Sequence, residues 1–158
     1  MMSREMKKQT NYQSNFPNVC YRSMSIDDFD AVISLWHSTE GIIVRSADNR
    51  KEIESYLIRN PDLSFVAEIN DSLVGTVMCG HDGRRGYLQH LAIENDYRTY
   101  GIGRELVRLA LSGLRDCGIR KCHLFVLRDN TSALDFWHHI GWHERTDLVM
   151  MSTHLSVE

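Results

Sequence analysis

The stretch His90-Leu91-Ala92-Ile93-Glu94-Asn95-Asp96-Tyr97-Arg98-Thr99-Tyr100-Gly101-Ile102-Gly103-Arg104 decides the fold, because it joins a strand-like segment to a long amphipathic one through a loop with two glycines. Residues 87–93 have strand composition, and residues 101–118 carry an apolar stripe at helical spacing. The first amide groups of a helix lack partners within it, and the helix dipole adds positive charge there. We therefore predict that this loop binds a phosphate or pyrophosphate, with Arg98 and Arg104 beside it.

Outward from this stretch, the periodicity predicts a mixed α/β sheet flanked by about four helices. Three strands before the helix alternate with short turns and form an antiparallel meander, and the apolar strand after the helix is expected to join the sheet in parallel. The expected order is β-α-α-β-β-β-α-β-α-β. The strands are predicted at 19–24, 64–69, 73–80, 87–93, 121–127 and 142–152. The first helix is predicted from a start signal at 25–28 through Trp36, and the others at 48–60, 101–118 and 130–140.

Composition excludes several classes of protein. The chain has 158 residues, 42% of them apolar, and a net charge of −3, which is not the basic character that nucleic acid partners require. We find no apolar run long enough for a membrane span, and the opening 18 residues lack the apolar core of a secretory signal. We expect a cytoplasmic protein with a flexible extension at 1–18 and one domain at 19–158. The four cysteines form no CxxC pair, so no metal site is predicted.

The sequence of this loop does not match either of two common phosphate-binding motifs. A dinucleotide fingerprint needs a third glycine where Leu106 stands, and a P-loop needs lysine and a hydroxyl residue after Gly103. The pattern that fits is [Q/R]xxGx[G/A], over Arg98-Thr99-Tyr100-Gly101-Ile102-Gly103. A helix-terminus site for some other nucleotide remains an alternative.

These residues resemble the GNAT superfamily of acyl-CoA-dependent N-acyltransferases. The family's LAV or LAI strand is similar to Leu91-Ala92-Ile93, and its YRxxGxG loop is similar to Tyr97–Gly103. A second family motif resembles Asn130–Trp142, NTSALDFWHHIGW. The resemblance covers about residues 19–152 and looks like small bacterial members of the family.

The resemblance implies acetyl-CoA as cosubstrate. Its pyrophosphate is expected on the amides of residues 99–104, its pantetheine arm along the 91–93 strand, and one strand N–H on the thioester carbonyl. Asn130 is expected to hydrogen-bond the arm. The implied cosubstrate-binding residues are Leu91, Ala92, Ile93, Arg98, Thr99, Tyr100, Gly101, Ile102, Gly103, Arg104, Asn130 and Trp137.

The candidates for taking the proton of the amine are Tyr87, Gln89 and His90. Strand alternation places Tyr87 and Gln89 on one face and His90 on the other, unless a bulge re-aims one of them. Because glutamine is no base, a water relay held by Gln89 or Tyr87 competes with direct catalysis by His90.

Trp137 stands where the family commonly has a tyrosine acid, and an indole N–H is only a donor. The resemblance implies acetyl transfer to a primary amine of an unidentified small-molecule or protein acceptor, by direct attack in a ternary complex, with a homodimer as one possible assembly. The alternative is an acyl-CoA-binding or sensing domain with weak or no turnover.

Overall fold

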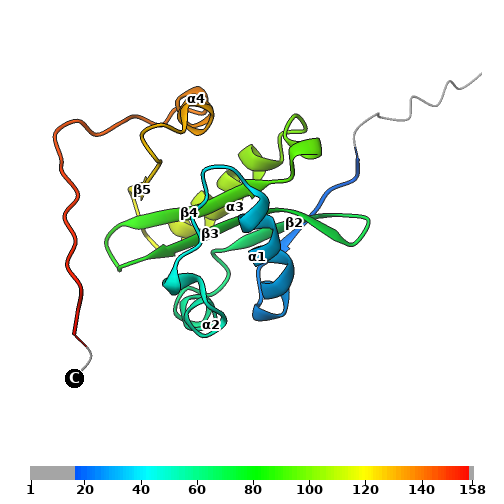
Figure 1. Cartoon of the computed structure of the whole chain (residues 1–158), viewed down its shortest axis with the longest axis horizontal. Helices are drawn as coiled ribbons and strands as arrows, with labels where there is room; N and C mark the ends of the chain where they lie inside the picture. Colours follow the sequence, from blue (N-terminus) through cyan, green and yellow to red (C-terminus); the bar gives the residue numbers. More distant parts are fainter. Residues whose placement is uncertain (1–16, 157–158) are drawn as a thin grey trace, which may run out of the picture. The chain divides into compact units, whose positions relative to one another are not determined.

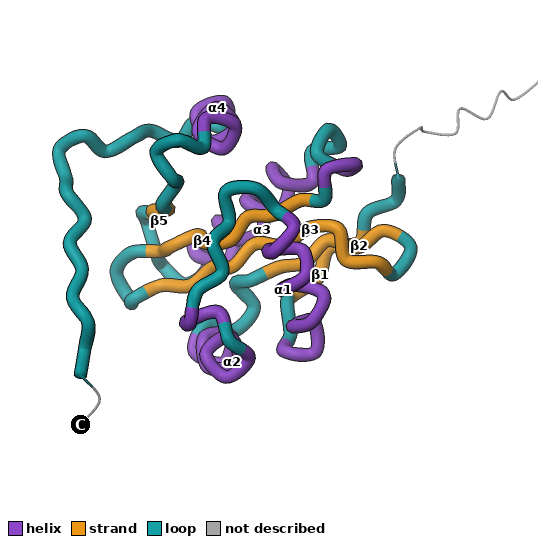
Figure 2. Tube along the Cα trace, in the orientation of Figure 1, coloured by secondary structure: helices purple, strands orange, loops and turns teal. Residues whose placement is uncertain are grey.

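The computed structural model describes residues 17–156, so most of the predicted extension at 1–18 lies outside the described residues. One mixed sheet has the strand order β1-β2-β3-β4-β5 (Figures 1 and 2). The strands are β1 (Cys20–Ser23), β2 (Phe65–Ile69), β3 (Ser72–His81), β4 (Gly86–Ile93) and β5 (Cys122–Leu124). The helices are α1 (Phe29–Ser38), α2 (Arg50–Arg59), α3 (Ile102–Asp116) and α4 (Thr131–His139), with short 3-10 turns η1 (Ile26–Asp28), η2 (Ser46–Asp48) and η3 (Asn95–Tyr97).

The first four strands pair antiparallel, and β5 pairs with β4 in parallel. This arrangement confirms the predicted mixed α/β sheet, its meander and its parallel strand after α3. The chain divides into two compact units, Met1–Leu124 and Phe125–Glu158, and the whole sheet belongs to the first. Within the described residues, no helix is both long and apolar enough to cross a bilayer.

In the first unit the helices cover both faces of the sheet (Figure 1). A Cβ on Gly75 of β3 would lie 2.9 Å from Ile93 and 3.2 Å from Leu106 of α3, so α3 packs closely on that face. On the other face, Trp36 of α1 is fully buried, and its indole N–H donates to Thr76 Oγ1 at 2.9 Å. The face under α1 and α2 is therefore held by packing and by a buried hydrogen bond.

The prediction of a last strand at 142–152 is wrong. Residues 142–156 form no strand in the structure, and predicted strand 121–127 shortens to Cys122–Leu124. An apolar segment forms a strand only where a neighbouring strand accepts its backbone hydrogen bonds. No described strand pairs with 142–156, and the side chains of Leu148 to Met151 are exposed.

Candidate active site

The predicted anion loop forms the N-terminal end of α3. Gly101 is the N-cap residue and has a left-handed backbone, with φ 75°. No side chain caps the helix, and the first bond of the helix runs from Glu105 N to Gly101 O at 3.1 Å. The amides of Ile102, Gly103 and Arg104 precede that bond and are free of the helix ladder. These features fit a bound pyrophosphate.

The rest of the loop connects this helix to the end of β4. The 3-10 turn η3 precedes it, and the Arg98 guanidinium donates from Nε to the Ile93 carbonyl oxygen at 3.2 Å. Arg98, Thr99 and Tyr100 are all exposed. Arg98 therefore lies at the junction of strand and loop that the sequence predicts.

The edge of β4 next to the loop is open. Pairing between β4 and β5 runs from Gly86 with Cys122 to Leu88 with Leu124 and stops there. From Gln89 to Ile93, β4 has no strand partner on this side in the part of the chain that the structure describes. Such an edge offers main-chain donors and acceptors to an extended ligand, as expected for Leu91, Ala92 and Ile93.

A β-bulge changes the direction of one candidate base. Thr76 pairs with Ala92 and Met78 with Gln89, so β4 carries one residue more than β3 across this interval. His90 takes the extra position with φ 48°. Its ring lies against Trp36 of α1, with the centroids 4.4 Å apart. The simple alternation is therefore wrong for His90, which faces the α1 and α2 side of the sheet.

Asp48 of η2 is the closest polar partner of this histidine. His90 Nε2 lies 2.9 Å from Asp48 Oδ1, and the side chains are 18% and 9% exposed. The other carboxylate oxygen of Asp48 accepts the Arg45 amide at 2.9 Å. Asp48 is not among the residues predicted from the sequence, because the pair is separated by 42 residues and no local pattern links them.

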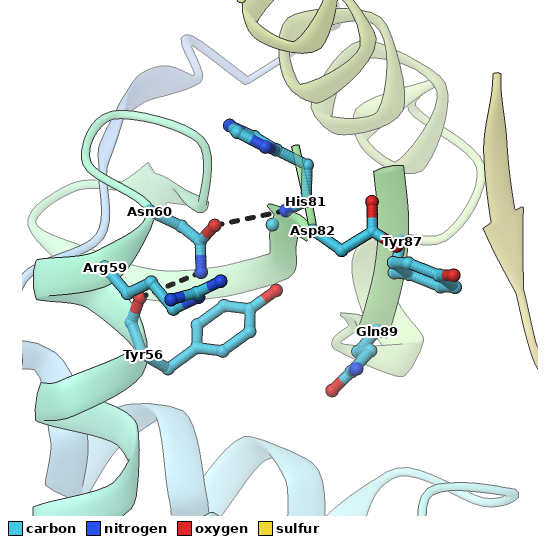
Figure 3. Close-up of a pocket in the computed structure, with 8 residues that line it drawn as sticks. Tyr56, Arg59, Asn60, His81, Asp82, Tyr87 and Gln89 are labelled. Atoms are coloured by element: carbon cyan, nitrogen blue, oxygen red, sulfur yellow. Dashed lines mark hydrogen bonds between the residues drawn. The ribbon is translucent and has the colours of Figure 1, made fainter. Parts of the chain in front are cut away.

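A cavity of about 210 Å³ lies on the same face, between α2 and the ends of β3 and β4 (Figure 3). Tyr87 and Gln89 of β4 line it, so two of the predicted candidates share one cavity. Its other lining residues are Tyr56, Arg59, Asn60, Gly80, His81 and Asp82. His90 does not line the cavity, but it follows Gln89 on the same face.

The wall formed by α2 is polar and close to β3. Asn60 accepts the His81 amide at 3.1 Å and donates to the Tyr56 carbonyl oxygen at 3.2 Å. The Tyr56 hydroxyl is buried without a hydrogen-bond partner among the described residues, and Figure 3 shows it pointing from α2 toward β4. Burial raises the pKa of Tyr56, so its hydroxyl stays protonated near neutral pH.

The second unit holds the remaining candidates. Asn130 caps α4, because its side-chain oxygen accepts the Ala133 amide at 3.1 Å. Trp137 is 8% exposed and packs edge-on against Phe136 and Trp142, with ring centroids 5.1 Å apart in each pair. Within this unit Trp137 is a packing residue. Its indole N–H is a hydrogen-bond donor only and does not release a proton.

Comparison with known proteins places the chain in a family. The profile of the Acetyltransferase (GNAT) family matches residues 29–142. An acetyltransferase of Pectobacterium atrosepticum is 35% identical over 129 residues, which cover 82% of this chain and 90% of that protein. The crystal structure of PaiA N-acetyltransferase from Thermoplasma acidophilum in complex with coenzyme A has a TM-score of 0.73 at 22% identity, over 82% of this chain and 93% of that one. An aminoglycoside acetyltransferase from a soil metagenome, solved with sisomicin, has a TM-score of 0.68 at 17% identity, over 90% and 98%.

These findings define the chain as an acyltransferase with the fold predicted from the strand, loop and helix. It belongs to the Acetyltransferase (GNAT) family, whose members use acetyl-CoA as cosubstrate. The uncapped N-terminus of α3 and the open edge of β4 fit that cosubstrate.

Proposed function

We propose that the chain transfers the acetyl group of acetyl-CoA to a primary amine that enters the cavity beside β4. The observation that carries this proposal is the bulge in β4, which brings Tyr87, Gln89 and His90 to one face of the sheet. Two of these residues line one cavity, and the third has a carboxylate partner. The open edge for the cosubstrate belongs to the same strand.

Binding of acetyl-CoA is assigned to two backbone surfaces. The amides of Ile102 to Arg104 hold the pyrophosphate, where the helix dipole favours negative charge. The main chain of Leu91 to Ile93 holds the pantetheine arm, and one amide there donates to the thioester oxygen. In other enzymes, removal of one such donor lowers the rate about 10²- to 10³-fold.

The chain's own residues then manage the proton. As the amine nitrogen bonds to the acyl carbon, the C–S bond breaks and coenzyme A leaves as its thiolate. The amine gives up one proton, and we assign His90 on this face as the base that takes it. Because His90 lies beside the cavity, we assign Gln89 and Tyr87 to holding the amine, or a water that passes its proton to the imidazole.

The cavity also limits the acceptor. Its volume of about 210 Å³ suits a small polar amine or the end of a longer chain. Arg59 and Asp82 stand at its exposed rim, and the Asp82 carboxylate accepts the amides of Arg84 and Arg85 in its own turn. Arg59 is therefore the stronger candidate to contact the acceptor, and the group that it contacts would be anionic.

Release of free thiol from acetyl-CoA across a panel of amines tests this function. The panel should pair amines that carry a carboxylate with diamines of similar size. His90→Asn is the matched variant, because asparagine tolerates the left-handed backbone but takes no proton. We expect kcat to fall by about 10²- to 10⁴-fold with unchanged binding of coenzyme A. Tight binding without thiol release from any amine would instead favour a sensing domain.

A further inference from the structure

Asp48 connects the segment between α1 and α2 to the bulge in β4. Its carboxylate has two oxygens with different partners: Oδ1 lies 2.9 Å from His90 Nε2, and Oδ2 accepts the Arg45 amide at 2.9 Å. Asp48 as a whole residue is buried, with 7% of its surface exposed. A buried carboxylate that accepts two hydrogen bonds holds both donors in one orientation.

We infer that Asp48 is a positioning residue that fixes the tautomer of His90, an inference that rests on the proposed acetyl transfer. A carboxylate only accepts, so the proton of the neutral imidazole must sit on Nε2. Nδ1 is then left with its lone pair and has no hydrogen-bond partner in the part of the chain that the structure describes. Nδ1 is therefore the atom that receives the proton from the acceptor amine.

Contacts from several elements hold His90 in place. The ring is 4.4 Å from the Trp36 ring, the Trp36 N–H donates to Thr76 Oγ1 at 2.9 Å, and that hydroxyl donates to the His90 carbonyl oxygen at 3.1 Å. Three elements, α1, β3 and η2, thus fix the residue. A left-handed backbone at a residue other than glycine is kept only where the surrounding structure determines it, and such positions cluster at functional sites.

Asp48→Asn separates tautomer control from packing. The Arg45 amide needs an oxygen, so the side-chain oxygen of the introduced asparagine is expected to stay there and its NH₂ group to face Nε2. Nε2 must then accept, which moves the imidazole proton to Nδ1 and removes the base. We expect kcat to fall about 10²-fold or more, while Asp48→Glu, which keeps a carboxylate at a position where glutamate is a favoured cap, restores part of it.

Two measurements carry the test. Long-range ¹H–¹⁵N spectra of protein labelled at histidine report which ring nitrogen holds the proton, and His90→Asn identifies the His90 signals by their loss. Amine-dependent thiol release gives kcat on the same samples. The matched control is Asn49→Ala, since Asn49 accepts the Glu52 amide in the same segment without touching His90. This control should keep both the Nε2–H tautomer and kcat.

The inference stands if the wild type shows Nε2–H, Asp48→Asn shows Nδ1–H, and kcat falls with the change. Unchanged kcat after the tautomer moves would overturn the role of Asp48 and leave acetyl transfer intact. A wild-type His90 protonated on Nδ1 alone would overturn it as well, whether or not Asp48→Asn folds. Absence of thiol release with every amine would instead refute the proposed function, and the inference with it.

Discussion

Replacing Gly101 with valine should abolish most binding of coenzyme A. Gly101 has φ +75°, and no heavy atom lies within 4 Å of an added Cβ, so the substitution meets backbone strain and no clash. A residue other than glycine pays about 1–2 kcal/mol in this region. We expect the loop to relieve that strain by rotating, which would turn the amides of Ile102 and Gly103 away from the proposed pyrophosphate site.

The magnitude follows from those two amides. A hydrogen bond to a charged group contributes about 1.5–3 kcal/mol, so the loss of two weakens binding by about 3–6 kcal/mol, or roughly 10²- to 10⁴-fold in Kd. Isothermal titration with coenzyme A measures this directly.

Gly118→Val is the matched control. Gly118 follows the other end of α3, has φ +78°, and also has no heavy atom within 4 Å of an added Cβ. Both variants should lose a similar amount of stability in urea unfolding, because the strain is the same. Only Gly101→Val should lose affinity. Equal affinity for coenzyme A in the two variants would refute the assignment of the α3 amides.

Three further predictions concern other parts of the chain. Burial opposes ionisation of Asp28, but hydrogen bonds from Arg22 outweigh it and lower the pKa of that carboxyl. The stability that this pair contributes is therefore complete above the unfolded pKa of Asp28, near 4, and is lost as the pH falls through the lower folded pKa. Urea unfolding at pH 7 and at pH 3 measures this loss, and the difference in unfolding free energy between the two pH values should be smaller in Arg22→Met than in the wild type. Burial raises the pKa of Cys79 to about 12. A thiol reagent at pH 8 should therefore modify exposed Cys20 and leave Cys79 intact until the protein unfolds. Mass spectrometry of the peptides measures the modification at each site. Trp137→Tyr should leave kcat unchanged in the thiol assay, because a thiol with a reference pKa near 8.5 leaves as thiolate without an acid; a large rise would show that proton donation limits the rate.

Local patterns predicted the strand, loop and helix around Gly101 well. The strand ending at Ile93, the two glycines and the apolar stripe of α3 lie within 30 residues of one another, and each depends on backbone preferences that a short sequence determines. The left-handed Gly101 is such a preference, since glycine adopts this conformation without steric cost.

The acceptor side depends on contacts that no short pattern contains. The bulge at His90 arises from the register between β3 and β4, and a shift of one residue reverses the face of a side chain. The pairing of His90 with Asp48 depends on where η2 packs, and the Tyr56 hydroxyl meets β3 only after α2 docks. The final strand was expected at 142–152 from its local sequence alone, which supplies no partner for its backbone.

Backbone amide spectra recorded during titration with coenzyme A test the central claim most directly. If the main chain holds the ligand, the largest shifts should fall at Ile102 to Arg104 and at Gln89 to Ile93, while Gly118 at the far end of α3 barely moves. Saturable binding that leaves the amides of Ile102 to Arg104 unshifted would contradict the account.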